Sequence, residues 1–443
     1  MSVDKPTIPF SWAVAQLSDV AGFEMGQAPP ASECNVTGVG TIFVKAGEFG
    51  KDLPVVREWT TKPLKFAKSG DVLICVVGAT SGKLNLGIDC AIGRSVAAIR
   101  PEPGIDTKLL YRQLMLQVKT LRSASTGSAQ GVISKEMLAR IEVAIPPEKE
   151  QRRIADKLGI MLARVDAVNE RLERIAPLLN RFRQSVLAAA VAGKLTEDWR
   201  ASVELDDSWR DTNVGGVIVD LRYGTSKKCD STAVGTAVLR IPNVGPAGTI
   251  QLDNLKYANF DDKEREKLAL EVEDLLVIRS NGSVDLVGRA CIVDSRAAGM
   301  LFAGYLIRLR VDREKAIPKF LWLTLSGPAI RGRIEATARS TSGVNNINSE
   351  ELKALPMRIP LREEQVEIVR RVELLFAYAD RLEARLRAAR TTTERLTPAL
   401  LTKAFRGELM PQDPGDAPAS ELLRRLKANA SSTRVKKDRK RSA

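Results

Sequence analysis

Apolar residues recur in one part of the chain at alternating steps of four and three positions, with polar and charged residues between them. An average spacing of 3.5 residues is typical of the apolar seam of a coiled coil. The pattern therefore predicts a long helix that needs an apolar partner. Its seam positions are Ile154, Leu158, Met161, Val165, Val168, Leu172, Ile175, Leu179, Phe182, Val186 and Ala189.

The stretch that carries this pattern occurs twice. Residues 145–195 align without a gap to residues 359–409, at an offset of 214, which is 359 minus 145. Because each seam needs a partner, we expect the two helices to pair with each other as an antiparallel coiled coil. The second copy keeps the seam at Ile368, Val372, Leu375, Ala379, Leu382, Leu386, Ala389, Leu396 and Leu400, with Thr393 as a polar exception.

Proline and glycine mark both ends of the repeated helix. Pro146 and Pro147 suit the first turn of a helix, where a missing N–H costs nothing. Gly193 and Gly407 suit the C-terminal cap, where the backbone turns left-handed. Pro177 lies inside the first copy, so we expect it to kink or interrupt that helix.

Each copy of the helix follows a globule of short apolar runs separated by glycine, a pattern typical of strands joined by tight turns. Trp12 and Trp209 stand at corresponding places near the start of the two globules. We therefore predict an α+β fold made by tandem duplication of a mixed, β-rich globule and a long helix. The expected segments are globules at 1–145 and 200–358, helical regions at 146–199 and 359–413, and a basic, flexible tail at 414–443.

The chain carries a formal charge of +14 and has a pI near 9.6. This charge favours a polyanionic partner, either nucleic acid or an acidic membrane surface, although scattered surface lysines would give the same total. The first residues lack a basic start followed by an apolar core, and no apolar run approaches about 18 residues. We expect a cytosolic protein that does not enter a membrane.

The residues available for catalysis are limited. The chain has no histidine, which excludes Ser-His-Asp, Cys-His and histidine–metal chemistry. Its five cysteines contain no CxxC pair, so we expect reduced core or loop thiols and no metal site. The segment GATSGK at Gly78–Lys83 is one residue too short for a phosphate-binding loop, and Leu84 stands where a Ser or Thr would hold magnesium.

The length of the repeated helix gives it a possible role as a spacer. A helix from Ile154 to Val186 spans about 48 Å, or roughly 14 base pairs of duplex. Two globules joined to an antiparallel pair of such helices could read two short sites on one DNA face. The two sites would differ because the globules differ in sequence. The alternative is a two-domain scaffold that its helices merely hold together.

Particular segments of the chain resemble a known family. The helix start IPPEKEQ, the helix end LAAAVAGKLTEDW and their echo REEQ…LLTKAFRGELMPQDP, each after a variable globule, are similar to the specificity (S) subunit of type I restriction-modification systems. The resemblance extends from Trp12 to about Asp413. The helical regions carry its specific part, and the globules match mainly in plan.

The resemblance implies that both globules are target-recognition domains, which together read an asymmetric, bipartite sequence in double-stranded DNA. It implies that the helices dock two methyltransferase (M) subunits, and that restriction (R) subunits join for cleavage, in a bacterial or archaeal cytoplasm. The S subunit would have no catalytic residues of its own. S-adenosylmethionine would bind the methyltransferase subunit, and ATP and Mg the restriction subunit. The Asn/Asp-Pro-Pro-aromatic motif of an amino-methyltransferase is absent from the sequence.

Base reading needs Arg, Lys, Asn or Gln on loops, whereas Lys, Ser and backbone N–H groups hold phosphates. Each candidate loop could instead be only a turn. Two other functions are left open by the residues: a self-sufficient nuclease or methyltransferase, and a coiled-coil adaptor for proteins. The candidate DNA contacts are Thr80, Ser81, Lys83, Ser125, Thr126, Gln130, Lys227, Lys228, Arg279, Ser280, Asn281, Arg339, Ser340 and Asn345.

Overall fold

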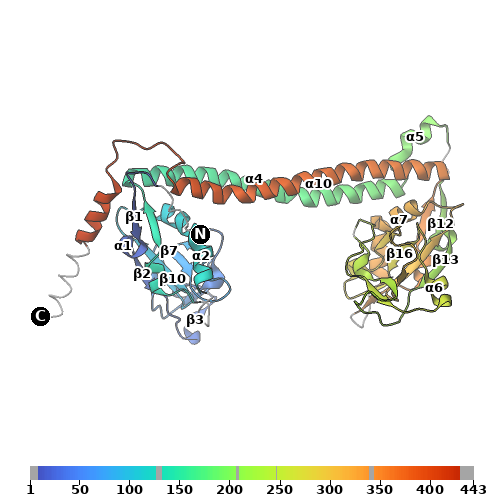
Figure 1. Ribbon diagram of the computed structural model, residues 1–443, viewed down its shortest axis with the longest axis horizontal. Coiled ribbons are helices and arrows are strands. Elements are labelled where there is room, and N and C mark those ends of the chain that lie inside the picture. The colour runs from blue at the N-terminus through green and yellow to red at the C-terminus, as the bar shows by residue number, and fades with distance from the viewer. Residues whose placement is uncertain (1–7, 126–131, 206–208, 246, 339–343, 430–443) are drawn as a thin grey trace. The chain divides into compact units, whose positions relative to one another are not determined.

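The computed structural model describes residues 8–125, 132–205, 209–245, 247–338 and 344–429. The chain forms two compact units. The first comprises Met1–Arg171 and Ala389–Ala443, and the second comprises Leu172–Ala388. Each unit contains one globule and one end of each long helix, so the fold is the mixed α+β tandem arrangement that the repeat predicts (Figure 1).

The first globule is built on two sheets. One has four antiparallel strands in the order β2-β10-β7-β8, and the other has five strands in the order β3-β5-β4-β9-β6. A separate pair joins β1 to β11 near the start of the long helix. The strands are β1 (Ala13–Gln16), β2 (Ala21–Met25), β3 (Cys34–Asn35), β4 (Thr41–Val44), β5 (Trp59–Thr60), β6 (Phe66–Ala67), β7 (Val72–Cys75), β8 (Leu84–Leu86), β9 (Cys90–Ile92), β10 (Val96–Pro101) and β11 (Glu142–Ile145).

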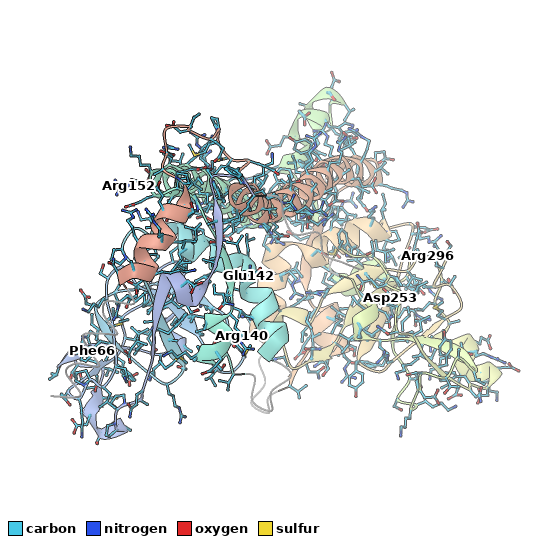
Figure 2. The ribbon with its side chains drawn as sticks, turned by 60° about the vertical axis from the view of Figure 1, so that its left-hand side comes forward. Phe66, Arg140, Glu142, Arg152, Asp253 and Arg296 are labelled. Carbon is cyan, nitrogen blue, oxygen red and sulfur yellow. The ribbon has the colours of Figure 1, made fainter. Side chains whose placement is uncertain are left out.

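Helices cover one side of this globule. They are α1 (Leu17–Val20), α2 (Thr107–Ser125) and α3 (Lys135–Ala139). The strand β7 is a continuous apolar run and is buried along its whole length, as expected for a central strand that is covered on both faces. Side chains of α2, among them Tyr111 and Leu114, complete the core. Within this unit, Phe66 of β6 and Arg152 of the long helix lie at opposite ends (Figure 2).

The second globule repeats the plan. Its four-stranded sheet has the order β13-β20-β16-β18, a second sheet has the order β15-β14-β19, and β12 pairs with β22 as β1 pairs with β11. Its strands are β12 (Arg210–Asn213), β13 (Ile218–Tyr223), β14 (Thr236–Leu239), β15 (Lys256–Ala258), β16 (Leu275–Ile278), β17 (Ser280–Asn281), β18 (Ala290–Ile292), β19 (Leu301–Phe302), β20 (Leu306–Val311), β21 (Asn345–Asn346) and β22 (Pro356–Ile359). Its helices are α6 (Asp262–Leu268), α7 (Pro318–Ser326), α8 (Pro328–Thr337) and α9 (Ser349–Lys353), and α5 (Glu197–Ser202) precedes it.

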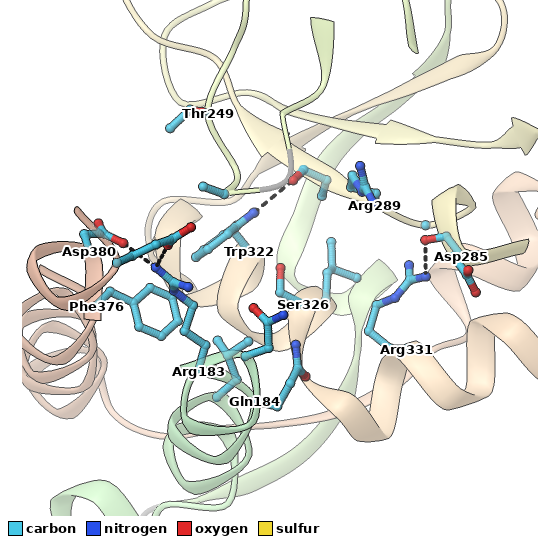
Figure 3. Close-up of a pocket in the computed structure, with 17 residues that line it drawn as sticks. Arg183, Gln184, Thr249, Asp285, Arg289, Trp322, Ser326, Arg331, Phe376 and Asp380 are labelled. Carbon is cyan, nitrogen blue, oxygen red and sulfur yellow. Dashed lines mark hydrogen bonds and ion pairs between the residues drawn. The ribbon is translucent and has the colours of Figure 1, made fainter. Parts of the chain in front are cut away.

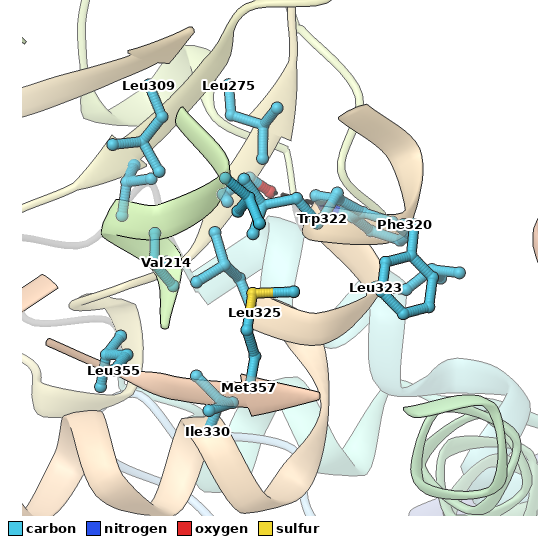
Figure 4. Close-up of a cluster of buried hydrophobic side chains, with 14 of the residues drawn as sticks. Val214, Leu275, Leu309, Phe320, Trp322, Leu323, Leu325, Ile330, Leu355 and Met357 are labelled. Atoms are coloured by element: carbon cyan, nitrogen blue, oxygen red, sulfur yellow. Dashed lines mark hydrogen bonds between the residues drawn. The ribbon is translucent and has the colours of Figure 1, made fainter. Parts of the chain in front are cut away.

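The main core of the second globule lies between the four-stranded sheet and the helix α7 (Figure 4). Leu275 and Leu309 from the sheet and Phe320 from α7 are fully buried. Trp322 joins the same cluster, and its indole Nε1 donates to the carbonyl of Ala290 at 3.0 Å, which satisfies its only polar group. The core thus fixes α7 against β18, at the base of the loop that precedes this strand.

Each repeated stretch forms one continuous helix of 44 residues, α4 (Glu148–Val191) and α10 (Arg362–Phe405). The helix α4 continues through Pro177, so the predicted interruption there is wrong. Pro177 is exposed. The C-terminal caps are confirmed, because Gly193 and Gly407 both have a φ of +74° just after the last helical turn.

The two long helices pack against each other in antiparallel register (Figure 1). In the first unit Leu158 of α4 shares an apolar cluster with Leu401 of α10. In the second unit Leu179 of α4 shares another with Ala379 of α10. Most predicted seam residues are buried or partly buried, namely Ile154, Leu158, Val165, Leu172, Leu179, Ile368, Val372, Leu382 and Leu386. Val168 of α4 is 42% exposed, so its assignment to the seam is wrong.

Near the end of α10 the seam departs from the predicted positions. Leu396 is 40% exposed, so its assignment to the seam is wrong, whereas Thr393 is buried at 7% exposure. Thr393 can occupy the seam because its hydroxyl donates to the carbonyl of Arg390 at 2.9 Å. The seam then takes a step of four to the partly buried Thr397. Pro398 follows directly and removes one helical hydrogen bond.

A Glu-Gln pair attaches each globule to the start of its long helix. In the first unit the side chain of Gln151 accepts from the N–H of Asp106 at 2.8 Å and donates to the carbonyls of Gly104 and Pro146. Gln365 makes the same three kinds of bond in the second unit, to Ile317, Lys315 and Pro360. These shared bonds explain why the glutamine is repeated.

The segment after α10 does not form the predicted flexible tail over its described part. Residues 419–429 form a helix whose Ala419, Leu422 and Leu426 are buried in the core of the first globule. Asp416 binds Arg153 of α4 at 2.5 Å. The apolar residues of this short stretch lie at helical spacing, which the basic composition of the neighbouring residues obscured. Residues 430–443 lie outside the described part.

All five cysteines are free thiols, as expected, and Cys75, Cys90 and Cys291 are buried. Burial raises the pKa of Cys75 to about 11 and the pKa of both Cys90 and Cys291 to about 12, so these thiols are protonated at neutral pH. Within the described residues, no helix combines the length and the apolar character that crossing a bilayer would require.

Candidate nucleic-acid interface

In the second globule two loops that are far apart in sequence come together. The short strands β17 and β21 pair, with Ser280 opposite Asn346 and Asn281 opposite Asn345. The side chain of Asn345 donates to the carbonyl of Gly282 at 3.0 Å. The structure thus brings together four of the predicted contact residues, Arg279, Ser280, Asn281 and Asn345. Their contact with DNA stays a prediction.

Arg279 is held in place beside these two strands. Its guanidinium lies 4.6 Å from the centre of the Tyr223 ring, and its Nε donates to Oδ1 of Asn346 at 3.3 Å. The Tyr223 hydroxyl in turn accepts from the N–H of Ser349 at 2.8 Å. The two Nη groups of Arg279 donate to none of the residues that the structure describes. A planar fork that is fixed at one edge and open at the other suits a bidentate acceptor such as the O6 and N7 atoms of guanine.

Two tyrosines beside Arg279 escaped the sequence reasoning. Tyr223 is 38% exposed, and Tyr305 is 62% exposed. The carbonyl of Tyr305 accepts from the N–H of Arg279 at 2.9 Å, so the two residues are adjacent. The available signal was the single polar aromatic residue in FAGYLIRLR, just before a buried strand. The sequence alone does not show that this tyrosine lies beside Arg279, because the contact depends on the pairing of two strands.

The two adjacent lysines of the second globule differ in their surroundings. Lys227 lies 3.2 Å from Glu264, and its ammonium group sits 4.9 Å from the centre of the Phe260 ring. Lys228 is exposed and has no ion pair within the described part of the chain. Lys228 is therefore the better candidate for a phosphate contact, because it need not give up a partner.

The corresponding loop of the first globule is less open than predicted. Ser81 is only 4% exposed, so its hydroxyl is not presented at the surface as expected. The cause is Arg122 of α2, whose Nε donates to the Ser81 carbonyl at 2.6 Å and holds that part of the loop inward. Lys83 is exposed, but its Nζ donates to the carbonyl of Phe49 at 2.7 Å. Thr80 is exposed, as predicted.

The two loops have the same backbone framework. Gly82 donates to Cys75, and Gly288 donates to Ile278, both at 2.7 Å. Both glycines have positive φ, 84° and 76°. A side chain at Gly288 would meet Ile334 at 2.6 Å, so the close approach of a helix requires glycine there.

The shared framework shows which residues of the two globules correspond to each other where the sequences do not align. Lys83 corresponds to Arg289. In each globule the strand residue whose carbonyl accepts from the glycine, Cys75 or Ile278, donates its own N–H to the carbonyl of Lys83 or Arg289. Arg331 corresponds to Arg122, since its Nη1 donates to the Val287 carbonyl at 2.6 Å. An arginine from a helix thus anchors the loop in both globules. Sequence reasoning missed Arg122, Arg289 and Arg331 because nothing in their local sequence marks them.

The framework also shows how the globules differ chemically. The N–H of Val76 donates to Ser95 at 2.9 Å, as that of Arg279 donates to Tyr305. In the pairing of β2 with β10, Met25 occupies the place that Tyr223 occupies in the pairing of β13 with β20. The Arg-Tyr-Tyr set of the second globule is therefore replaced by valine, methionine and serine in the first. The exposed Arg94, next to Ser95, supplies a cation there instead.

The other predicted contacts fall where the structure gives no side-chain information. Ser125 is the last residue of α2, but its side chain is not described. Thr126, Gln130, Arg339 and Ser340 lie outside the described residues. Within the described residues, no three His, Cys, Asp or Glu side chains are grouped so that they could hold a metal ion.

A family model and two relatives of this chain all belong to type I restriction specificity proteins. Residues 9–176 match the family model described as "Type I restriction modification DNA specificity domain". The chain is 36% identical over 378 residues to the type I restriction enzyme StySPI specificity subunit of Salmonella potsdam, covering 83% of this chain and 81% of that one. It is 34% identical over 373 residues to the EcoKI specificity subunit of Escherichia coli K12, covering 82% and 80%.

Solved structures share the fold. The HsdS subunit of Thermoanaerobacter tengcongensis superposes with a TM-score of 0.60 at 18% identity, covering 92% of this chain and 100% of that one. A chain from a structure of the assembly and conformational transition of a type I R-M system superposes with a TM-score of 0.68 at 18% identity, covering 91% and 100%.

Proposed function

Because this chain belongs to the family of type I restriction-enzyme specificity subunits, we propose that it reads a bipartite, asymmetric target in double-stranded DNA. Each globule would read one half of the target. The paired helices would space the two halves and dock the subunits that act on the DNA. The chain itself would contribute recognition and no catalysis.

The observation that carries this proposal is the difference between two loops built on one framework. Arg279, stacked on Tyr223, presents unoccupied donors in the second globule. The first globule has Val76 and Met25 at the same two places. Two readers with the same backbone and different side chains would recognise different bases, which makes the target asymmetric. The charge of +14 supports binding to the DNA backbone.

The helices also carry matching surface features for partners. Ile160 on α4 is 58% exposed, and Leu374 on α10 is 59% exposed. The two residues occupy the same place in the repeat, since 374 is 214 residues after 160. A large apolar side chain left exposed at the same place in both copies fits two copies of one partner protein. We assign these residues to the docking of two methyltransferase subunits, with restriction subunits joining that complex.

The cofactors of the reaction belong, in this proposal, to the partners. S-adenosylmethionine would bind the methyltransferase subunit, and ATP and Mg the restriction subunit, all in a bacterial or archaeal cytoplasm.

Binding by the purified chain tests the proposal. Bound duplexes would be selected from a random pool at about 0.1 M salt and sequenced. The proposal expects an enriched sequence with two unlike blocks separated by a fixed gap. Enrichment of a single block, or binding without sequence preference, would contradict the bipartite reading. Methyl transfer or DNA cleavage by the chain alone would contradict its non-catalytic role.

A further inference from the structure

A cavity of about 700 Å³ lies in the second unit and is lined in part by Asp285 and Arg289, which belong to the segment between Arg279 and β18 (Figure 3). Three parts of the unit line it. The loop before β18 contributes Gly288 and Arg289, the helices α7 and α8 contribute Trp322 and Arg331, and the long helices contribute residues of both α4 and α10. The cavity therefore joins the candidate reading loop to the helix pair.

The reading loop and the cavity are one hydrogen-bond step apart. The N–H of Ile278 donates to the carbonyl of Arg289 at 2.9 Å, and Ile278 immediately precedes Arg279. A duplex held by Arg279 would thus pass close to Arg289. A phosphate of the same duplex is therefore the ligand that the position of the cavity favours.

Most of the charges around the cavity are neutralised by their neighbours. Arg183 of α4 binds Asp380 at 2.6 Å and Glu383 at 2.9 Å. Arg331 pairs with Glu335 at 3.4 Å and also donates to the carbonyls of Val287 and Asp285. In Figure 3 Asp285 lies beyond Arg331, on the side away from Trp322.

Arg289 is different from these residues. Its guanidinium has no ion pair or hydrogen bond to any residue in the described ranges. Desolvation lowers the pKa of Arg331, the ion pair with Glu335 partly opposes this shift, and the positive charge of Arg289 lowers the pKa further, so the two guanidinium groups repel each other. An anion between them would relieve this repulsion.

Uncharged donors complete the arrangement. Asn180 and Gln184 stand one turn apart on α4 and line the cavity, and Ser326 lines it from the end of α7. Their side chains make no hydrogen bond to a described residue. Arginine, asparagine, glutamine and serine are side chains that hold DNA phosphates. The cavity thus offers one unpaired cation, Arg289, and several unpaired polar groups, together with the carboxylate of Asp285, which forms no ion pair with a described residue.

We propose that this cavity holds a backbone phosphate of the duplex that the second globule reads. Arg289 supplies the charge, and Asn180 and Gln184 supply neutral donors from α4. The helix pair then contributes directly to DNA binding beside the second globule, in addition to spacing the two readers. This inference rests on the proposed function, because it requires DNA at the loop that carries Arg279.

Four variants of the full chain test the assignment on a duplex that contains the selected target. Arg289→Ala should weaken binding to target and non-target duplexes alike, by about ten-fold, and should lower the salt slope by about one. Gln184→Ala and Asn180→Ala remove no charge, so each should weaken binding by about three- to ten-fold and leave the salt slope unchanged. The matched control is Arg181→Ala, which removes a charge from an exposed residue of α4 outside the cavity and should change affinity by less than about two-fold.

Neutral methylphosphonate linkages placed one at a time through the second half-site identify the phosphate. The proposal expects one position at which the neutral linkage weakens the wild-type chain and leaves the Arg289→Ala chain unaffected. No such position, or an Arg289→Ala chain that behaves like Arg181→Ala, would overturn it. A changed base preference in Arg289→Ala would also overturn it, because the residue would then read a base. Equal melting temperatures would show that the variants are folded.

The two levels of the proposal fail in distinguishable ways. If the wild-type chain shows no sequence preference and Arg279→Ala is silent, the proposed function fails. If the wild-type chain and Arg279→Ala behave as proposed while Arg289→Ala, Gln184→Ala and Asn180→Ala match the control, only the phosphate site fails.

Discussion

The indole Nε1 of Trp12 donates to Oε2 of Glu150 at 3.0 Å, and both side chains are buried. The second unit repeats this bond between Trp209 and Glu364 at 3.1 Å. The tryptophan comes from the start of each globule and the glutamate from the first turn of each long helix. This buried bond, together with the neighbouring glutamine, fixes the direction in which each globule meets its helix.

Glu150 should make the stability of the first unit depend on pH. Burial raises the pKa of Glu150, and the bonds from Trp12 and Gln412 only partly oppose this shift. A carboxyl group with a raised pKa in the folded state stabilises the fold most below its ordinary pKa of 4.5, and this contribution is lost as the pH rises through the raised value. Glu150→Gln keeps an acceptor for Trp12 and removes the titration, so it should flatten the dependence of melting temperature on pH as the pH rises above 4.5.

Glu150→Ala provides the comparison. It leaves the Trp12 N–H without an acceptor and should cost about 1–3 kcal/mol of unfolding free energy below pH 4.5, and less as the pH rises through the raised pKa of Glu150, because the variant also loses the titration. An unchanged pH profile in Glu150→Gln would show that this carboxyl does not titrate differently on folding.

Arg279→Ala should weaken binding to the selected target by about 1–3 kcal/mol and relax the preference at one position of the second half-site. The physical reason is the loss of a bidentate donor that Tyr223 and Asn346 hold in place. Tyr223→Leu removes the aromatic face under Arg279 and the hydroxyl that accepts from Ser349 but leaves the Arg279 fork in place, so it should give a smaller loss at the same position. Competition binding with single-base variants of the target measures both effects, and an unchanged preference at every base would exclude this role for Arg279.

Lys227 and Lys228 should differ although they are neighbours. Lys228→Ala should weaken binding to all duplexes and reduce the salt slope by about one, because an unpaired ammonium group can release a counterion from the DNA. Lys227→Ala should change the slope less, since Glu264 already neutralises its charge. Affinities measured at several salt concentrations separate the two, and equal slopes in both variants would contradict the distinction.

The seam of α10 offers a test on stability. Leu396→Ala should cost less than about 0.5 kcal/mol, because the side chain is 40% exposed. Leu386→Ala removes a buried contact with Leu179 and should cost about 2–5 kcal/mol. Thermal denaturation compares the two variants. A larger loss for Leu396→Ala would restore the seam that the sequence pattern predicts.

The features that the sequence predicted are those written in local periodicity or in the repeat. The seam from Ile154 to Leu179 needs only neighbouring residues to define it, and so do the glycine caps. Leu396 was misplaced because a single step of four in place of three depends on whether Thr393 can satisfy its hydroxyl inside the seam.

The site depended on contacts across the chain. Arg279 and Asn346 are 67 positions apart, and Arg122 and Ser81 are 41 positions apart. No local pattern shows that the first pair presents a guanidinium or that the second draws a loop inward. The composition of the loops therefore predicted which loops carry candidate DNA contacts. Only the strand pairing showed which side chains meet.

Two unlike readers on paired helices should specify one bipartite target. Co-expression of the chain with its methyltransferase, followed by mapping of modified positions across the genome, would measure that target. A second chain would carry seven extra residues in α4 and seven matching ones in α10, which keeps the two helices in register. We expect two unlike half-sites at a fixed gap for the wild-type chain, and the same half-sites with the gap widened by about three base pairs for the second chain. An unaltered gap, or modification at a single undivided site, would contradict this expectation.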